Sequence, residues 1–230
     1  MFIWKYKTLA QHFKRKSILK LNELNNFLTV NRDIFLRTIM LTTAIAFFYR
    51  ESATEGAIIL AANTILMQFF SWMSYGIDGF AYAAESLVGK YVGAKKDHAT
   101  HRAIRLSFVW GMGLAVLYSL VFLGFGVDIL EEFTDKTPVI QAAIPYLWWV
   151  IFLPIVSTPC FIWDGVYVGM TASRAMLWGM LVAFPTYLVS YWALEPIFEN
   201  HALWMAFYVL MLMRGLTQQI LFSWKKLALN

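Results

Sequence analysis

The sequence has few charged residues and almost no cysteine. Only 14% of its 230 residues are charged and 60% are hydrophobic, whereas soluble domains carry about 25% charged residues. A soluble protein of this size cannot bury so much apolar surface, so the composition excludes a cytosolic enzyme, a nucleic-acid-binding domain and a disordered protein. With Cys160 as its single cysteine and only four histidines, the chain cannot form an internal disulfide, and a structural zinc site is not supported. The composition indicates an integral membrane protein, with the lipid bilayer as its partner.

Six apolar segments have the length that a membrane-spanning helix needs, about 20 residues. Strand-type alternation is absent, so the predicted fold is all-α, a polytopic bundle of six transmembrane helices. The expected helices cover residues 33–49, 56–91, 99–127, 138–170, 175–194 and 202–227. Asn31 is expected to cap the first helix, with Asp33 in its first turn. Residues 1–31 are then a basic, amphipathic cytoplasmic segment, and residues 32–230 form the bundle.

Positive charge is concentrated in alternate connecting segments. Most of the 19 lysines and arginines lie in the N-terminal segment, in the loop after the second helix, and at the C-terminus. Basic loops stay in the cytoplasm, and an even number of helices places both termini on one side. We therefore expect an inner-membrane protein with both termini in the cytoplasm. The net charge of +5 follows from this topology, and no nucleic-acid partner is expected.

A polar stripe runs along the second expected helix. Its members recur every three or four residues, which places them on one helical face: Thr64, Gln68, Ser71, Tyr75, Asp78, Tyr82 and Glu85. Such a stripe is expected to face a cavity or another helix, because polar groups that face lipid stay unpaired. Asp78 is the strongest functional candidate, since a carboxylate inside a membrane is costly. Helix–helix hydrogen bonding explains the uncharged members equally well, and Glu85 lies close enough to the helix end to snorkel or to pair with Lys90.

The fourth expected helix carries one carboxylate, Asp164, on the same face as Tyr167. Asp78 and Asp164 both lie about 15–18 Å from the cytoplasmic ends of their helices, so they are predicted to share a polar cavity. Each is followed by a glycine, which permits close approach of another helix or bending. Alternatively, Asp164 satisfies backbone groups freed by Pro159.

One arginine lies deep in the last expected helix. Arg214 is too far from the helix end to snorkel fully, so it is expected to neutralise a carboxylate or a cluster of carbonyls. Arg37, near the start of the first helix, is expected only to snorkel. The sequence has no phosphate-binding loop, metal-ligand cluster or nucleophile triad, so we predict no cofactor and no enzymatic activity.

Three stretches of the sequence resemble one transporter family. They are NRDIFLRT at 31–38, DGFAYAAESLVGKYVGAKK at 78–96 and WDGVYVGMTASRAM at 163–176, and RGL at 214–216 fits the same pattern. These stretches resemble the multidrug and toxic compound extrusion (MATE) transporters, in particular the subfamily of the DNA-damage-inducible protein F. Family members have twelve helices in two lobes. The resemblance implies that this chain is the C-terminal lobe, and that its basic start is similar to the linker between lobes.

The family exports organic cations and other amphipathic compounds in exchange for protons or sodium, through a cleft between rocking lobes. The resemblance implies the same antiport here, with a missing N-terminal lobe or a second copy of the chain as partner. The expected substrate- and ion-binding residues are Asp78, Asp164, Tyr75, Tyr82, Glu85, Tyr167 and Arg214.

The coupling ion stays open. Asp164 lies where the sodium-coupled branch has an acid, but the first helix lacks the second acid of that site. No residue matches the proton-coupling aspartate of the N-terminal lobe. An alternative is a non-transporting remnant or a membrane subunit that needs a partner lobe. An ion channel or lipid flippase would share the architecture, and no sequence feature favours either.

Overall fold

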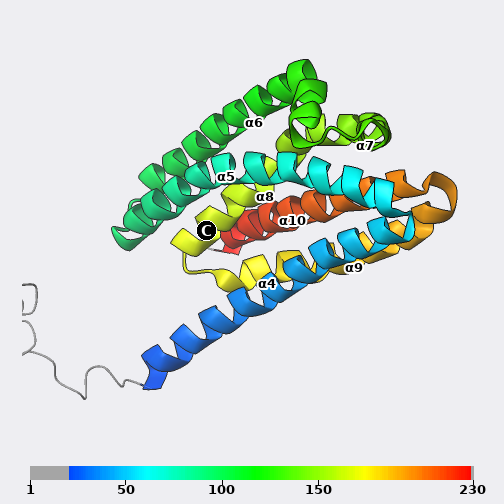
Figure 1. Ribbon diagram of the computed structural model, residues 1–230. Helices are drawn as coiled ribbons and strands as arrows, with labels where there is room; N and C mark the ends of the chain where they lie inside the picture. Colours follow the sequence, from blue (N-terminus) through cyan, green and yellow to red (C-terminus); the bar gives the residue numbers. More distant parts are fainter. Residues whose placement is uncertain (1–20, 229–230) are drawn as a thin grey trace, which may run out of the picture.

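Long helices make up the part of the chain that the structure, a computed structural model, describes, residues 21–228 (Figure 1). In chain order they are α4 (Leu21–Thr54), α5 (Ala57–Gly93), α6 (Asp97–Phe133), α7 (Thr137–Ala143), the 3-10 turn η1 (Ile144–Tyr146), α8 (Leu147–Gly169), α9 (Ser173–Phe198) and α10 (Asn200–Ala228). The described residues contain no strand. The all-α prediction is therefore confirmed, with α7, η1 and α8 together forming the fourth of the six expected helices.

Within the described residues, five helical segments are long and apolar enough to cross a membrane. They are Ala57–Gly93, Asp97–Phe133, Thr137–Gly169, Ser173–Phe198 and Asn200–Ser223. The helix α4 is as long as these, but charged residues recur along it, among them Arg32, Asp33, Arg37, Arg50 and Glu51. An apolar helix with interior charges needs partners for them, so α4 depends on its neighbours more than the other helices do.

The predicted start of the first helix is wrong. The helix α4 begins at Leu21, so Asn31 lies inside it, and its Nδ2 donates to the Phe27 carbonyl at 2.7 Å instead of capping a helix end. Asp33 is buried inside the helix rather than in a first turn. The predicted boundary between residues 1–31 and 32–230 thus falls within α4, and residues 1–20 lie outside the described part.

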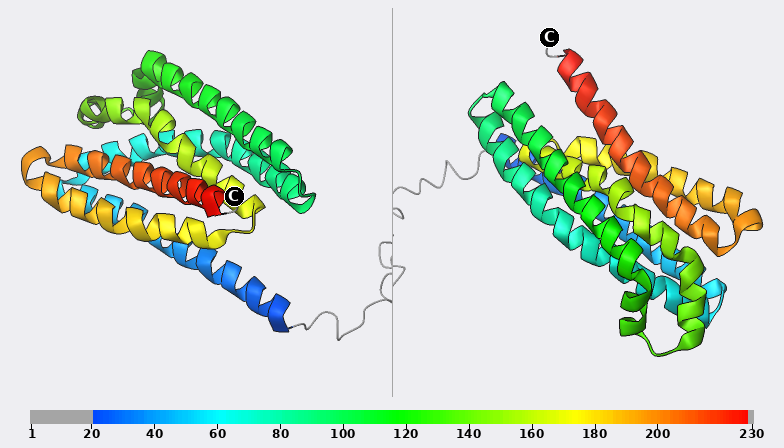
Figure 2. Two further views of the ribbon diagram at one scale, coloured as in Figure 1. Left: turned by 180° about the vertical axis from the view of Figure 1, so that it is seen from behind. Right: turned by 90° about the horizontal axis from the view of Figure 1, so that it is seen from above.

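The helix α4 meets α5 at one end of the molecule and diverges from it towards the other, so that α8 and α10 are seen between them (Figure 1). Each helix packs on particular neighbours: α10 on α9 and α8, α5 on α8 and α6, and α4 on α9. We call the end with the α5–α6 turn (Ala94–Lys96) and the α8–α9 turn the basic end. The α6–α7 and α9–α10 turns lie at the opposite end (Figure 2).

Two glycines of α8 bring its backbone against the backbone of α5. A Cβ on Gly165 would lie 2.1 Å from the Ala81 carbonyl oxygen, and one on Gly169 would lie 2.5 Å from the Glu85 carbonyl oxygen. No side chain fits at either position, which is the close packing that small residues allow between membrane helices. The glycine after Asp78 differs, since a Cβ on Gly79 would meet nothing within 4 Å. Of the glycines in the two Asp-Gly pairs, only Gly165 therefore lies against the backbone of another helix.

We expect Gly165→Ala to destabilise the bundle by about 1–3 kcal/mol, the usual cost of overpacking, because α5 and α8 must separate. Thermal unfolding of the purified protein in detergent would measure the loss. Gly79→Ala is the matched control and should leave the melting temperature unchanged or raise it, since alanine favours helix more than glycine does. Equal melting temperatures for the two variants would contradict the close contact.

Candidate functional site

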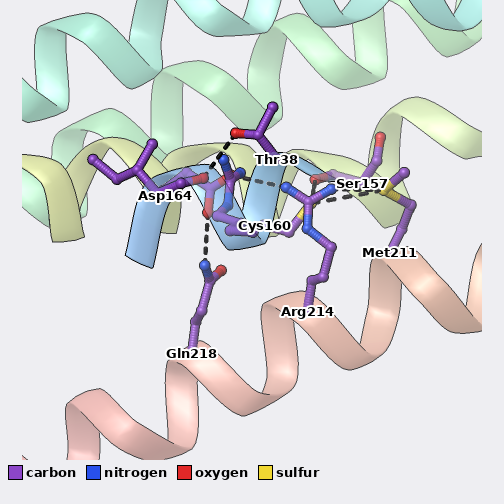
Figure 3. A network of polar contacts seen from close by, with 9 residues as sticks. Thr38, Ser157, Cys160, Asp164, Met211, Arg214 and Gln218 are labelled. Atoms are coloured by element: carbon purple, nitrogen blue, oxygen red, sulfur yellow. Dashed lines mark hydrogen bonds and ion pairs between the residues drawn. The ribbon is translucent and has the colours of Figure 1, made fainter. Parts of the chain in front are cut away.

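The side chain of Asp164 is the centre of an ion cluster that joins three helices. Its Oδ2 accepts hydrogen bonds from Arg37 of α4 and from Arg214 of α10, the latter at 2.8 Å, and its Oδ1 accepts one from Gln218 Nε2 at 2.7 Å. Figure 3 shows Asp164 with Arg214 and Gln218 directed towards it from α10. Both carboxylate oxygens are therefore engaged by side chains from outside α8.

Helix periodicity explains how the partners reach Asp164. Arg214 and Gln218 are four residues apart on α10, so both side chains lie on the same face of that helix. On α4, Arg37 is on the side of the helix that also carries the buried residues Ala44 and Phe48. The cluster is thus built from inward-facing positions of α4, α8 and α10.

The cluster carries more positive than negative charge. Two guanidinium groups share one carboxylate, and the exposed fractions are only 2% for Arg214, 13% for Asp164 and 14% for Arg37. Three buried polar atoms of this cluster have no hydrogen-bond partner among the described residues: Nε of Arg37, Nε of Arg214 and Oε1 of Gln218. Native structures contain few such atoms, and each calls for an explanation. Here they show that the polar groups of the cluster do not satisfy all of one another's hydrogen bonds.

The Arg214 guanidinium also contacts a sulfur atom and an aromatic ring. Its Nη1 lies 3.4 Å from Met211 Sδ, and its Cζ lies 5.8 Å from the centre of the Phe161 ring, within the range of cation–π attraction. Tyr167, expected to line a cavity, is fully buried, and its hydroxyl donates to the Gln218 backbone carbonyl at 2.7 Å. Tyr167 therefore links α8 to α10 and supports the helix turn that holds Gln218.

Asp78 differs from Asp164 in having no partner among the described residues. Its side chain is half-buried on α5 and makes neither a hydrogen bond nor an ion pair there. The charges of Asp164, Arg214 and Arg37 all act on it. The two carboxylates that the sequence singled out are thus electrostatic neighbours, but one is engaged on both oxygens and the other is free.

Several other members of the α5 stripe are exposed, whereas Thr64 and Ser71 are half-buried. Tyr75 and Tyr82 are 76% and 68% exposed, Gln68 is exposed, and Glu85 is half-buried. Glu85 makes no ion pair with Lys90 in the described part. No helix within residues 21–228 covers the exposed members of the stripe, so a surface that covers them would belong to another molecule or to another segment.

Among the charged residues of the cluster, Arg37 is the one whose role the sequence analysis misjudged. It was expected to snorkel, but it pairs with Asp164, which is 127 residues away in the chain. The available signal was the sign of its charge: an arginine inside an apolar helix needs a counter-charge, and Asp164 is an acid within a facing helix. The expectation that Arg214 neutralises a carboxylate agrees with its contact to Asp164.

A second buried polar cluster, at the end opposite the basic end, was not predicted. Asn63 Nδ2 donates to Ser52 Oγ at 2.8 Å and to Asn200 Oδ1 at 2.7 Å, while Trp204 Nε1 donates to Asn63 Oδ1 at 3.0 Å. Its members come from α4, α5 and α10, and they hold these helices together near their shared end. No group of three or more His, Cys, Asp or Glu side chains in the described residues is placed to hold a metal ion.

Comparison with known proteins places the chain in a transporter family. The family model described as MatE matches residues 34–192, so the chain belongs to the MatE family. It is 34% identical over 190 residues to the DNA damage-inducible protein F of Escherichia coli (strain K12), a match that covers 83% of this chain and 41% of that protein. The family consists of transporters, which confirms that the chain is not an enzyme. Together with its five apolar helices, family membership defines a multi-pass membrane protein.

Two solved structures share the fold. A mutant of the Vibrio cholerae MATE transporter VcmN superposes with a TM-score of 0.82 at 18% identity, over 96% of this chain and 49% of that one. A MOP superfamily transporter from Pyrococcus furiosus superposes with a TM-score of 0.75 at 14% identity, over 86% of this chain and 44% of that one. The chain therefore spans about half the length of the relatives that it matches.

We expect Asp164→Asn to destabilise the protein by about 3–5 kcal/mol, because it leaves two guanidinium groups without their counter-charge. Unfolding in detergent and the amount of protein in the membrane would both report the loss. Arg37→Gln should cost much less, since Asp164 and Arg214 then form a one-to-one pair. Asp128→Asn, at an exposed position of α6, is the control for carboxylate removal as such. Wild-type stability of Asp164→Asn would show that the cluster is dispensable for folding.

Proposed function

We propose that this chain is one lobe of a cation-coupled exporter, which moves cationic or amphipathic organic compounds out of the cell in exchange for protons or sodium. Membership in the MatE family and a length of about half that of its relatives support this assignment. Transport by such a lobe requires a second lobe, either an N-terminal lobe or another copy of this chain, so that a cleft can open alternately to each side of the membrane.

The observation that carries the proposal is the difference between Asp78 and Asp164. A proton or sodium ion that binds Asp164 must compete with the hydrogen bonds that its two oxygens accept from Arg37, Arg214 and Gln218. The Asp78 carboxylate has no such competitor within the described residues. We assign the change of protonation or of bound cation to Asp78. Asp164 then keeps Arg37 and Arg214 in place and balances part of their charge.

The neighbours of Asp78 suit an organic cation. Tyr75 and Tyr82 lie about one turn on either side of Asp78 on the α5 stripe, and both rings are exposed. An aromatic face attracts a cation, and a tyrosine hydroxyl also offers a hydrogen bond. Asp78 with these two rings therefore forms the substrate-facing surface of the lobe, and Glu85 extends its negative charge towards the basic end.

A second candidate function applies if no partner lobe joins this one. A lobe without its partner has no cleft between lobes, so the chain would then be a non-transporting remnant or a subunit of a larger assembly. The two functions differ in one measurable property, the ability to transport once a complementary lobe is supplied.

We expect a fusion of the N-terminal lobe of the Escherichia coli relative to this chain to export a cationic dye such as ethidium, and Asp78→Asn to cut that export at least tenfold, about 1.4 kcal/mol in coupling. Export would be followed in inside-out vesicles under a proton or a sodium gradient, which also identifies the coupling ion. The amount of the variant in the membrane should not change, because Asp78 supports no contact in the described fold.

The matched control for the fusion experiment is Asp128→Asn, which also removes a carboxylate but lies on an exposed part of α6. Full export by the Asp78→Asn fusion would remove Asp78 from the site. A well-inserted fusion with no export would favour the non-transporting function. Export by the lone chain, with no dimer found by cross-linking, would show that a partner lobe is unnecessary.

The expected orientation has the basic end in the cytoplasm of the cell and the protein in the inner membrane. Reporter fusions at Asp135, in the α6–α7 turn, and at Glu199, in the α9–α10 turn, should give periplasmic signals. A fusion at Lys96, in the α5–α6 turn, should give a cytoplasmic signal. A cytoplasmic signal at Asp135 would contradict both the orientation and the number of crossings before it.

A further inference from the structure

A small crevice opens near the basic end between α6, α8 and α10. Its volume is about 290 Å³, and its polar lining residues are His101, Arg105 and Gln219. All three side chains are exposed. The crevice lies outside the Asp164 cluster and the α5 stripe, and the proposed function makes no use of it.

The polar side of the crevice suits a phosphate group. Arg105 supplies a guanidinium, which binds phosphate oxygens through paired hydrogen bonds, and Gln219 supplies an amide. His101 Nδ1 lies 2.8 Å from the Asp97 carbonyl oxygen. A carbonyl oxygen can only accept, so Nδ1 carries the hydrogen, and Nε2 can donate to a phosphate oxygen only in the imidazolium form, in which both nitrogens carry a hydrogen.

The inner wall of the crevice is aromatic. Trp163 of α8 is buried beneath it, with ring centres 5.2 Å from Phe108 and 4.8 Å from Phe222. Phe222 also meets the His101 ring edge-on at 6.3 Å. Aromatic rings with polar neighbours are typical of the level at which a membrane meets water.

A second hollow continues from the crevice along α6. It has a volume of about 590 Å³, and its lining is wholly apolar: Phe108, Val109, Met112, Gly113 and Val116. Phe108 lines both hollows. Residues 101, 105, 108, 109, 112 and 116 recur at helical spacing, so the two hollows follow one face of α6, polar near the basic end and apolar further along.

The length of α6 allows the polar hollow to lie at the headgroup level of a bilayer and the apolar hollow to lie in its hydrocarbon core. The helix has 37 residues, so it is about 55 Å long, whereas the hydrocarbon core is about 30 Å thick. Its first turns therefore reach the headgroup level, where His101 and Arg105 lie, and Gly113 lies two turns deeper. Val109, Trp110 and Leu117 are exposed along the same helix, and apolar exposed side chains suit a helix face that meets lipid.

We propose that the two hollows together bind one anionic phospholipid. Its phosphate accepts hydrogen bonds from Arg105 and Gln219 beside His101, and one acyl chain follows α6 past Gly113 to Val116. Basic pockets between membrane helices bind anionic headgroups in this way. The helices α6 and α10 make little direct contact, so the lipid would join them across Trp163. The proposal requires only that the chain spans a membrane and is independent of the proposed export.

The test uses the full chain purified in mild detergent, with native mass spectrometry to count bound phosphatidylglycerol and phosphatidylcholine at equal concentrations. Wild-type protein should retain one phosphatidylglycerol in preference to phosphatidylcholine. Arg105→Gln should weaken phosphatidylglycerol binding about fivefold, the usual effect of one basic residue near a membrane surface. Arg102→Gln is the matched control, since Arg102 is exposed on the same helix but does not line the crevice. Equal losses in the two variants would mean diffuse charge attraction and would overturn the proposal.

A second pair of variants tests the acyl-chain part. A Cβ on Gly113 or on Gly124 would meet nothing within 4 Å, and both glycines lie on exposed positions of α6. Gly113→Leu should fill the apolar hollow and reduce bound phosphatidylglycerol, whereas Gly124→Leu should not. Unchanged binding in Gly113→Leu, or full displacement of the lipid by an equal concentration of inorganic phosphate, would show a phosphate site without a lipid and would overturn the proposal.

Discussion

The negative charge of Asp164 is what permits two arginines to lie inside an apolar bundle. A guanidinium buried without a counter-charge costs several kcal/mol, and Arg214 is almost completely buried. Asp164 supplies that counter-charge to Arg214 and to Arg37 at once, so α4, α8 and α10 are held together at one point. The helix α4 depends on this most, because its Arg37 is one of the two arginines and the helix otherwise packs mainly on α9.

Gly165, the residue after Asp164, determines how closely α8 packs on α5. Gly165 lets the α8 backbone approach the Ala81 carbonyl of α5 more closely than any side chain would permit. This contact brings the ion cluster near Asp78, so that the charges of the cluster act on a carboxylate of another helix. One Asp-Gly pair thus contributes both the centre of the cluster and the helix contact that couples it to the open carboxylate.

The surroundings of Asp78 and Asp164 suit the two carboxylates to different roles. Asp164 accepts hydrogen bonds on both oxygens, which suits a fixed counter-ion. Asp78 is half-buried, has no partner among the described residues, and lies on the helix face that carries Tyr75 and Tyr82. The proposed exporter uses Asp78 for exchange and Asp164 for support. The proposed lipid hollow lies at the α6–α10 side of the same lobe, where it would act on helix packing and leave the exchange site to α5.

The sequence by itself determined the class of the protein, because apolar length and helical periodicity are local properties. It predicted an all-α membrane bundle, the polar stripe of α5, and the need of Arg214 for a counter-charge. The start of α4 was misjudged at Asn31, since a side chain that prefers a cap can also bond a carbonyl one turn back.

Only the tertiary structure decided which charges meet. Arg37 and Asp164 are 127 residues apart, and no local pattern distinguishes an arginine that snorkels from one that reaches a facing helix. The same holds for the two Asp-Gly pairs, which are alike in sequence. Gly165 faces the α5 backbone and Gly79 faces open space, because helix rotation and helix crossing are set by the packing of the whole bundle.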